Sequence, residues 1–197
     1  DGKWLKKEMR AECYMLTGKT VGLVGIGNIA KKVAKMLKGF DCDILYYDVF
    51  RLPEETEKEM GVRFASLEEL MSRSDVVSIH CPLLESTKGM INAALIGKMK
   101  SSAILINTAR GGVVDEQSLA QALREKKIRG AGIDSYTVEP IPADHPFLSL
   151  DNCVLTSHNG GGVIDNVVPV TRHAFENIQK FSLGIAMDPR DVIVPRK

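Results

Sequence analysis

The sequence lacks the features that mark several large classes of protein. Its 197 residues contain four scattered cysteines, at positions 13, 42, 81 and 153, with no spacing typical of a metal site. No apolar run reaches the roughly 20 residues of a membrane-spanning helix, and we identify no secretory leader. Lys and Arg (26) nearly balance Asp and Glu (25). We therefore expect reduced thiols and a cytoplasmic protein, with no metal ion, no nucleic acid and no membrane among its partners.

What remains is an ordinary globular composition, 44% hydrophobic and 26% charged. Strands and helices are predicted to alternate, with Ser66 and Asp115 as helix caps. The expected strands are 20–24, 44–47, 62–64, 76–80, 103–107, 129–133 and 152–156, and the expected helices are 28–38, 54–60, 67–72, 92–98, 116–125 and 165–182. Most of these strands are apolar throughout, which is typical of a parallel sheet covered on both faces. The pattern predicts an α/β fold with a doubly wound parallel sheet.

The stretch from Thr20 to Ala30 is the most informative part of the chain. A β-branched apolar run leads into Gly25-x-Gly27-x-x-Ala30, and a helical segment follows. Gly25 permits a tight turn, Gly27 lets a pyrophosphate approach the backbone, and Ala30 lets the helix pack on the strand. Asp48 ends the next apolar run, 18 residues after Ala30, where an acid can accept hydrogen bonds from a ribose. The segment therefore predicts a dinucleotide-binding βαβ unit.

The charge at the end of the second strand indicates which dinucleotide is bound. Asp48 can bind the adenosine-ribose hydroxyls and would repel a 2′-phosphate, so the sequence favours NAD over NADP. Arg51 stands shortly after Asp48, and an arginine at such a place can accept a 2′-phosphate. We expect Asp48 to dominate, because it would face that phosphate directly.

Chemically capable side chains follow the later strands. Arg110 comes after the fifth expected strand, Asp134 and Glu139 after the sixth, and His158 after the seventh. Because the carboxyl ends of parallel strands meet at one edge of a sheet, where ligands bind, we expect these residues to converge. His80, at the end of the fourth strand, is interpreted as structural.

An arginine, an acid and a histidine at a nicotinamide site suit the oxidation of a 2-hydroxy acid. The imidazole of His158 can take the hydroxyl proton, or return it during reduction of the ketone. Glu139 can hold the other ring nitrogen and favour the protonated form. Arg110 can grip the substrate carboxylate with two parallel hydrogen bonds and polarise the carbonyl.

At this point the chain resembles the D-isomer-specific 2-hydroxyacid dehydrogenase family. The matching residues run in the family's order across nearly the whole chain: Gly25–Ala30, Asp48, His80–Leu83, Asn107–Gly112, Gly132–Asp134, Glu139–Pro140 and His158. The resemblance implies that Arg110, Glu139 and His158 form the catalytic set. It also implies a set of cofactor-binding residues: Gly25, Gly27, Asn28, Ile29, Asp48, Cys81, Pro82, Thr87, Thr108, Ala109, Asp134 and Gly161.

The chain also departs from the family's pattern at some positions. Ser157 stands where the family often has proline before the histidine, and Ser135-Tyr136 replaces a more usual Val-Phe. Family members have two domains, so the resemblance implies that this chain is the cofactor domain of a longer two-domain enzyme. We expect residues 1–17 to be an interdomain linking helix, 18–164 the NAD-binding Rossmann domain, and 165–197 a helix and tail crossing back to a substrate domain.

Three functional hypotheses remain open at this stage. The first is an NAD-dependent dehydrogenase of a small 2-hydroxy or 2-oxo acid, commonly a homodimer in this family and inactive as a cofactor domain alone. The second is an NAD(H)-sensing module similar to the family's transcriptional corepressors. The third is the cofactor domain of another Rossmann enzyme, such as an adenosylhomocysteine hydrolase, against which the run Asn107–Gly112 speaks.

Overall fold

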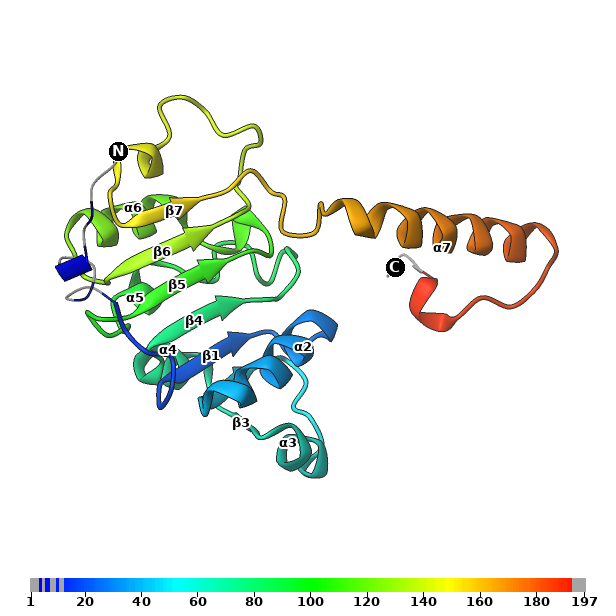
Figure 1. Ribbon diagram of the computed structural model, residues 1–197, viewed down its shortest axis with the longest axis horizontal. Helices are drawn as coiled ribbons and strands as arrows, with labels where there is room; N and C mark the ends of the chain where they lie inside the picture. The colour runs from blue at the N-terminus through cyan, green and yellow to red at the C-terminus, as the bar shows by residue number, and fades with distance from the viewer. Residues whose placement is uncertain (1–3, 5, 8–9, 11–12, 193–197) are drawn as a thin grey trace. The chain divides into compact units, whose positions relative to one another are not determined.

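The computed structural model describes residues 4, 6, 7, 10 and 13–192 (Figure 1). Within this part of the chain, parallel strands form one sheet in the order β3-β2-β1-β4-β5-β6-β7. The strands are β1 (Thr20–Val24), β2 (Asp43–Tyr47), β3 (Val62–Phe64), β4 (Val76–Ile79), β5 (Ile104–Asn107), β6 (Gly130–Ile133) and β7 (Cys153–Leu155). Each predicted strand is confirmed to within one residue at either end.

The order of the strands reverses at the middle of the sheet. β1 pairs with β2 on one side and with β4 on the other, so the chain builds outward first in one direction and then in the other. In open α/β sheets such a switch point creates a crevice beyond the carboxyl ends of the two central strands. The sheet is therefore the doubly wound Rossmann arrangement that the sequence predicts.

Helices connect the strands as expected. They are α2 (Asn28–Leu37), α3 (Glu54–Met60), α4 (Leu67–Arg73), α5 (Ala93–Ile96), α6 (Glu116–Arg124) and α7 (Ile164–Ser182), with 3-10 turns η1 (Lys38–Phe40), η2 (Gly111–Val113), η3 (Pro146–Ser149) and η4 (Pro189–Asp191). The two predicted caps are confirmed, because Ser66 Oγ accepts from the Glu69 amide at 3.2 Å and Asp115 Oδ1 from the Ser118 amide at 3.1 Å. α5 is shorter than predicted.

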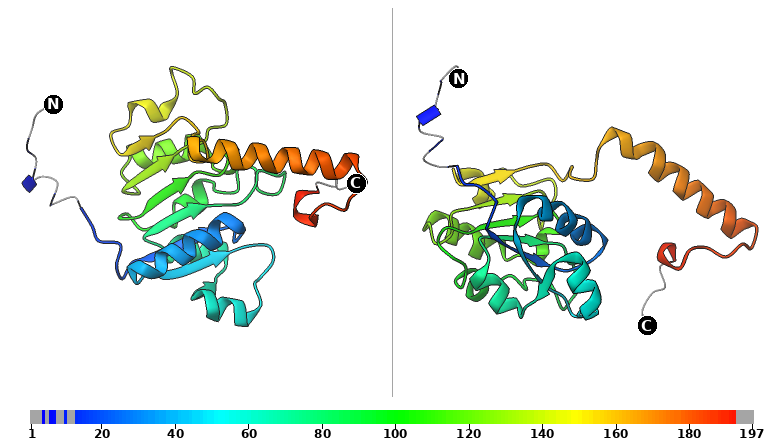
Figure 2. Two further views of the ribbon diagram at one scale, coloured as in Figure 1. Left: turned by 45° about the vertical axis from the view of Figure 1, so that its right-hand side comes forward. Right: turned by 60° about the horizontal axis from the view of Figure 1, so that its bottom comes forward.

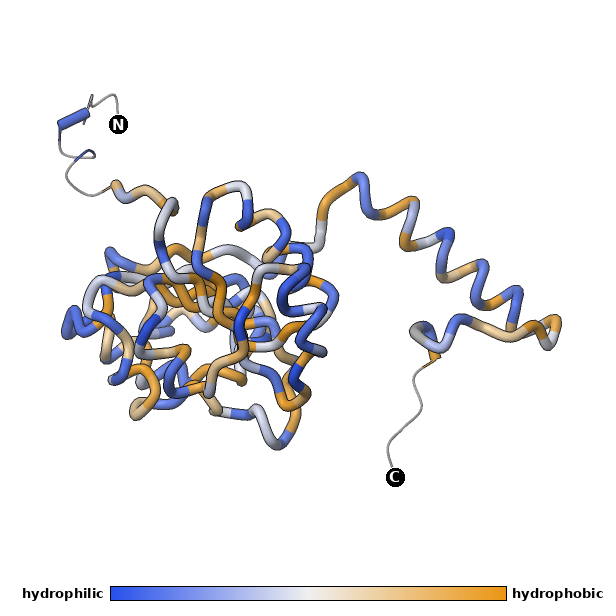
Figure 3. Tube along the Cα trace, turned by 90° about the horizontal axis from the view of Figure 1, so that it is seen from below, coloured by the Kyte–Doolittle hydropathy of each residue, from blue (hydrophilic) through white to orange (hydrophobic). Residues whose placement is uncertain are grey.

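Different helices cover the two faces of the sheet, because side chains alternate along each strand. Leu23 of β1 packs with Ala34 of α2 on one face. Val24 packs in a second core with Leu70 of α4, on the face that α5 and α6 also cover (Figure 1). A Cβ on Gly22 would lie 2.5 Å from the Leu70 side chain, so α4 lies directly against β1. Hydrophobic stretches of the chain accordingly run through the interior of the layers formed by the sheet and its helices (Figure 3).

The segment that leads into β1 differs from its prediction. Residues 6, 7 and 10 are helical, but 13–16 have no regular secondary structure, so the helix expected over 1–17 has ended before residue 13. The other positions of that helix lie outside the described residues.

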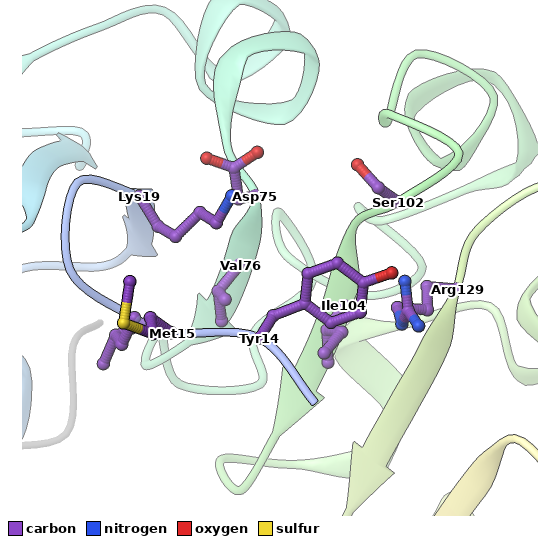
Figure 4. Close-up of a pocket in the computed structure, with 9 residues that line it drawn as sticks. Tyr14, Met15, Lys19, Asp75, Val76, Ser102, Ile104 and Arg129 are labelled. Atoms are coloured by element: carbon purple, nitrogen blue, oxygen red, sulfur yellow. The ribbon is translucent and has the colours of Figure 1, made fainter. Parts of the chain in front are cut away.

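Residues 14–16 help to enclose a small cavity at the amino ends of β4 and β5. The Tyr14 ring lies 4.0 Å from the guanidinium of Arg129. Together with Lys19, Asp75 and Ser102, these side chains line a space of about 180 Å³ (Figure 4). The cavity is therefore at the edge of the sheet opposite to the one that should bind a dinucleotide.

The chain divides into two compact units, residues 1–157 and 158–197. In the second unit α7 runs as one helix although it contains Pro169 (Figure 2). The tail after α7 is attached to the helix by a hydrogen bond of 2.9 Å between His173 Nε2 and Asp191 Oδ1. This hydrogen bond lowers the pKa of the Asp191 carboxyl.

Candidate active site

The turn after β1 requires glycine at position 25. Gly25 has φ +95°, a conformation that L-residues rarely adopt, and its amide donates to the Tyr47 carbonyl at 2.7 Å. A Cβ there would lie 2.8 Å from the Cys81 amide nitrogen and 2.9 Å from the His80 carbonyl carbon. Gly25 thus brings the glycine loop against the end of β4, at the switch point of the sheet.

The amino end of α2 is open. Gly27 is the N-cap, and no side chain caps the helix among the described residues. A Cβ built on Gly27 meets no described atom within 4 Å, and the adjoining Asn28 and Ile29 are exposed, Ile29 by 71%. Uncapped amide groups and the positive end of the helix dipole therefore face free space, which is the arrangement that binds a pyrophosphate.

Asp48 is attached to the same loop. Its Oδ2 accepts a hydrogen bond from the Ile26 amide at 2.8 Å, and its Oδ1 accepts from the Phe50 amide at 3.3 Å. Each carboxylate oxygen has two lone pairs, so the group retains acceptor capacity for ribose hydroxyls. The open helix end, the glycine loop and this carboxylate together fit NAD.

The loop after β4 carries three of the expected cofactor residues. Burial raises the pKa of the Cys81 thiol to about 11, and the Asp48 carboxylate adds to the shift. Pro82 is exposed. Thr87 Oγ1 donates to the Pro82 carbonyl at 2.6 Å and accepts from the Leu84 amide at 2.8 Å, so this hydroxyl shapes the loop. His80 bonds to Ser78 Oγ at 2.9 Å, in keeping with its structural interpretation.

The loop after β5 is held by a buried asparagine. Asn107, only 1% exposed, donates from Nδ2 to the Arg110 carbonyl at 3.0 Å and accepts at Oδ1 from the Ala109 amide at 3.1 Å. These two bonds fold the chain over Thr108 and leave the Arg110 side chain exposed, with Nη1 donating to the Ala109 carbonyl at 2.7 Å. Arg110 therefore projects from a fixed turn at the carboxyl edge.

The loops after β5 and β6 lie against each other at a second glycine. A Cβ on Gly111 would fall 1.9 Å from the carbonyl carbon of Tyr136 and 2.3 Å from the Thr137 nitrogen. No other residue fits there without separating the loops. Gly111 follows Arg110 and Tyr136 precedes Glu139, so this contact brings together the segments that carry two of the three predicted catalytic residues.

Tyr136 links the acid loop to the end of β7. Its amide donates to Glu139 Oε1 at 2.9 Å, and its hydroxyl donates to the Thr156 carbonyl at 2.8 Å. Asp134, 5% exposed, accepts from Thr156 Oγ1 at 2.6 Å and donates from its amide to the Asn107 carbonyl at 2.9 Å. The ends of β5, β6 and β7 are thus joined by side chains as well as by sheet hydrogen bonds.

A glutamate of α6 anchors the same loop. Glu116 Oε1 accepts from the Thr137 amide at 2.7 Å, and its Oε2 lies 3.3 Å from His145 Nε2. The Phe147 amide donates to His145 Nδ1 at 3.3 Å. Since Nδ1 is an acceptor, Nε2 carries the ring proton and donates it to Glu116.

The remaining predicted residues, His158 and Gly161, belong to the second unit. His158 is its first residue and has φ +53°, the left-handed region. Gly161 accepts a hydrogen bond from Asn166 Nδ2 at 3.4 Å, and a Cβ on it would meet nothing within 4 Å. The close packing at the carboxyl edge is therefore between the loops that carry Arg110 and Glu139, while His158 comes three residues after the end of β7 along the chain.

Sequence reasoning missed the residues that position this site. Asn107 and Gly111 belong to the motif around Arg110, but the motif alone does not indicate that they shape its loop. Glu116 and Tyr136 lie outside every motif that predicts the site. Only the Gly-Gly pair gave a local signal, because a glycine next to a functional residue often marks a close backbone approach.

Comparison with known proteins now identifies the chain's relatives. Residues 1–160 match the family model described as "D-isomer specific 2-hydroxyacid dehydrogenase, NAD binding domain". The chain belongs to this family. The cofactor domain and NAD predicted from the glycine loop and Asp48 agree with that description.

Individual relatives include several dehydrogenases and reductases. The chain is 43% identical over 186 residues to a glyoxylate reductase of Korarchaeum cryptofilum, covering 93% of this chain and 56% of that protein. It is 47% identical over 153 residues to a formate dehydrogenase of Chaetomium thermophilum, covering 77% and 41% respectively. The chain spans about half the length of the curated relatives it matches.

Solved structures of dehydrogenases also resemble this chain. A Granulicella formate dehydrogenase superposes with a TM-score of 0.92 at 29% identity, covering 98% of this chain and 52% of that one. The apo form of Rhodotorula graminis D-mandelate dehydrogenase gives 0.83 at 34% identity, covering 90% and 52%. In the described part of the chain, no helix is both long and apolar enough to span a bilayer.

Proposed function

We propose that this chain is the cofactor-binding part of an NAD-dependent enzyme that interconverts a small D-2-hydroxy acid and the corresponding 2-oxo acid. The observation that supports the proposal is the close approach of Gly111 to Tyr136, which holds together the loops that carry Arg110 and Glu139 at the carboxyl edge of the sheet, where the amino end of α2 is uncapped. NAD, when bound, supplies the hydride acceptor or donor.

Each catalytic side chain has a distinct task in this proposal. Arg110, exposed and presented by the Asn107 turn, binds the substrate carboxylate and polarises the carbonyl at C2. His158 takes the hydroxyl proton during oxidation and returns it during reduction. Glu139 orients the imidazole and favours its protonated form. Asp48 binds the adenosine ribose, and Cys81, Pro82, Thr87, Thr108, Ala109, Asp134 and Gly161 line the cofactor channel.

The test compares turnover by this chain with turnover by the proposed longer protein, in which this chain would be the cofactor domain of a two-domain enzyme. NADH consumption is followed optically with glyoxylate, hydroxypyruvate, glycerate, phosphoglycerate and lactate as substrates. We expect the longer protein to be active and this chain to bind NAD but turn over little substrate. Comparable turnover in both would refute the need for a further substrate domain.

Formate is a second candidate substrate, since one relative named formate dehydrogenase is 47% identical. The two substrates make different demands on His158. Oxidation of a hydroxy acid releases a hydroxyl proton as well as a hydride, whereas formate releases only a hydride and becomes carbon dioxide. His158→Ala should therefore abolish hydroxy-acid oxidation by removing its base, with a smaller loss for formate.

The alternative is an NAD(H)-sensing module similar to the corepressors of this family. His158→Ala also separates this reading, since an enzyme loses turnover while cofactor binding persists. No measurable turnover by the intact wild-type protein would favour the module. We further propose a homodimer in the cytoplasm, and a monomer in sedimentation at high concentration would contradict the dimer.

A further inference from the structure

Arg51, the residue that could accept a 2′-phosphate, is engaged by another group. Its Nε lies 2.9 Å from Glu57 Oε1 and its Nη2 lies 3.0 Å from Oε2, so both oxygens of the carboxylate are held in a two-pronged pair. The guanidinium also lies 5.5 Å from the Phe64 ring centroid. The loop after β2 therefore carries a cation that is fixed on α3 and β3.

Glu57 is held in place from the other side. Its side chain is only 9% exposed, whereas that of Arg51 is 60% exposed. Tyr46, a fully buried residue of β2, donates its hydroxyl to Glu57 Oε1 at 2.7 Å and accepts at that hydroxyl from the Leu52 amide at 2.8 Å. The bonds from Arg51 and Tyr46 lower the pKa of Glu57, so the carboxylate is charged at neutral pH.

These contacts disfavour the binding of a phosphate by Arg51. A guanidinium that turned to a phosphate would leave Glu57 charged, mostly buried and with one partner fewer. Losing one partner of a buried charge is costly, because the remaining group keeps its desolvation penalty without its compensation. Arg51, the basic residue closest in sequence to Asp48, is therefore held away from the ribose site by Glu57.

We propose that Glu57 is a cofactor-selectivity residue, which disfavours NADP by holding Arg51 away from the 2′-phosphate position. Selectivity in this view has two separate parts. Asp48 repels the phosphate, and the Arg51–Glu57 pair removes the group that would attract it. The inference rests on the proposed role of Asp48 at the ribose.

The experiment measures the dissociation constants of NAD and NADP by calorimetry on the chain itself. The variants are Asp48→Asn, Glu57→Gln and the two together, with Glu55→Gln as the matched control. Glu55 lies on the same helix and carries the same charge, but it pairs with Lys58 at 3.8 Å and not with Arg51.

We expect wild type to bind NAD in preference to NADP, and Asp48→Asn to weaken that preference. Adding Glu57→Gln should strengthen NADP binding by roughly a further tenfold, the gain of one charge-assisted hydrogen bond to phosphate, while NAD affinity stays the same. Adding Glu55→Gln instead should have no such effect.

A double-mutant cycle shows whether Glu57 acts through Arg51. In an Asp48→Asn, Arg51→Leu background, Glu57→Gln should no longer change NADP affinity. Should Glu57→Gln fail to fold in a thermal melt, Arg51→Lys replaces it, because lysine keeps the charge without the two-pronged grip. Arg51→Lys should likewise improve NADP binding in the Asp48→Asn background.

The experiment distinguishes failure of the proposed cofactor site from failure of the inference about Glu57. If wild type binds no NAD, the cofactor site itself is wrong, and this inference fails with it. If NAD binds but neither Glu57→Gln nor Arg51→Lys improves NADP binding, only the inference is overturned. The same holds if the effect of Glu57→Gln persists when Arg51 is leucine.

Discussion

The two sides of the carboxyl edge of the sheet are built from the same local parts. On the β1–β2 side, Gly25 lies against the end of β4 and Asp48 accepts an amide hydrogen bond from the glycine loop. On the β5–β6 side, Gly111 lies against the loop after β6, and Glu139 accepts an amide hydrogen bond within that loop. In each case a glycine sets how closely two loops approach and an acid fixes the backbone.

The difference lies in what the supporting glutamate holds. Glu57 binds the side chain of Arg51, whereas Glu116 binds the backbone of Thr137 and the ring of His145. Control of a cation near the ribose site suits a choice between ligands, and control of a backbone suits a fixed geometry. In the proposals made above, the first side determines which cofactor binds and the second determines how the reacting groups are aligned.

Gly111→Ala should have the largest effect and should act on the second side only. Its Cβ would lie 1.9 Å from the Tyr136 carbonyl carbon, so the two loops must separate. Overpacking of this kind costs about 1–3 kcal/mol or more, and turnover of the longer protein should disappear. Gly112→Ala is the control, since its Cβ would meet only the Leu83 side chain, at 3.2 Å. Equal losses of turnover in Gly111→Ala and Gly112→Ala would show that the close approach of Gly111 to Tyr136 has no special role on the β5–β6 side.

Asn107→Ala should come next. The change leaves the Ala109 amide and the Arg110 carbonyl without their partner in a half-buried turn, at a cost of about 1–3 kcal/mol. We expect a lower melting temperature and a raised KM for the acid substrate, because Arg110 is less well fixed. An unchanged KM would show that the turn does not position the arginine.

Glu116→Gln should lower kcat while leaving NAD affinity unaltered. Glutamine can still accept from the Thr137 amide, but its amino group cannot accept the proton of His145 Nε2. Faster hydrogen exchange at the Phe147 amide, which donates to His145 Nδ1, would report the loosened loop. A loss of NAD affinity as large as the loss of kcat would contradict the division of labour between the two sides.

The pH dependence of stability should reveal the Glu57 pair. The pKa of Glu57 is lowered in the folded state by Arg51 and Tyr46, so the pair stabilises the fold above the unfolded pKa of about 4.3. That contribution is lost as the pH falls through the lowered value. In urea unfolding, the difference between wild type and Glu57→Gln should shrink on going from neutral pH to about pH 3. A constant difference would show that the charge of Glu57 contributes nothing.

Ser135→Ala should have the smallest effect. The Ser135 hydroxyl is buried and has no hydrogen-bond partner within the described structure. Its removal should change stability by less than about 1 kcal/mol, in the stabilising direction, because a desolvated hydroxyl is lost. Ser78→Ala is the contrasting control, since that hydroxyl bonds to His80 and its loss should destabilise. Thermal melts of both variants test whether Ser135→Ala slightly raises the melting temperature while Ser78→Ala lowers it.

Sequence reasoning reached the fold because the fold follows from local patterns. Apolar runs such as Val76–Ile79 predict buried parallel strands, and the parallel sheet then brings Arg110 to the edge where Gly27 opens α2. It failed for residues 13–16, where an amphipathic pattern is not helical. In that segment Leu16 packs against the core beneath β1 and β2, and the Tyr14 ring lies over Arg129, contacts that the helical pattern does not encode.

The supporting contacts could not be predicted from the sequence. Arg51 was recognised as a possible phosphate ligand, but its partner Glu57 lies on α3 and is oriented by Tyr46 from β2. Such a triad depends on how three elements pack, which no local pattern encodes. The contact of Gly111 with Tyr136 likewise joins segments far apart in the chain.

The central claim is that a dinucleotide occupies the free space in front of α2, and Gly27→Val tests it most directly. A Cβ at Gly27 meets nothing within 4 Å, and the same is true of Gly39, which provides the control substitution Gly39→Val. Calorimetric titration with NAD should show binding by wild type and Gly39→Val and none by Gly27→Val, at similar melting temperatures. Undiminished NAD binding by Gly27→Val would contradict the account.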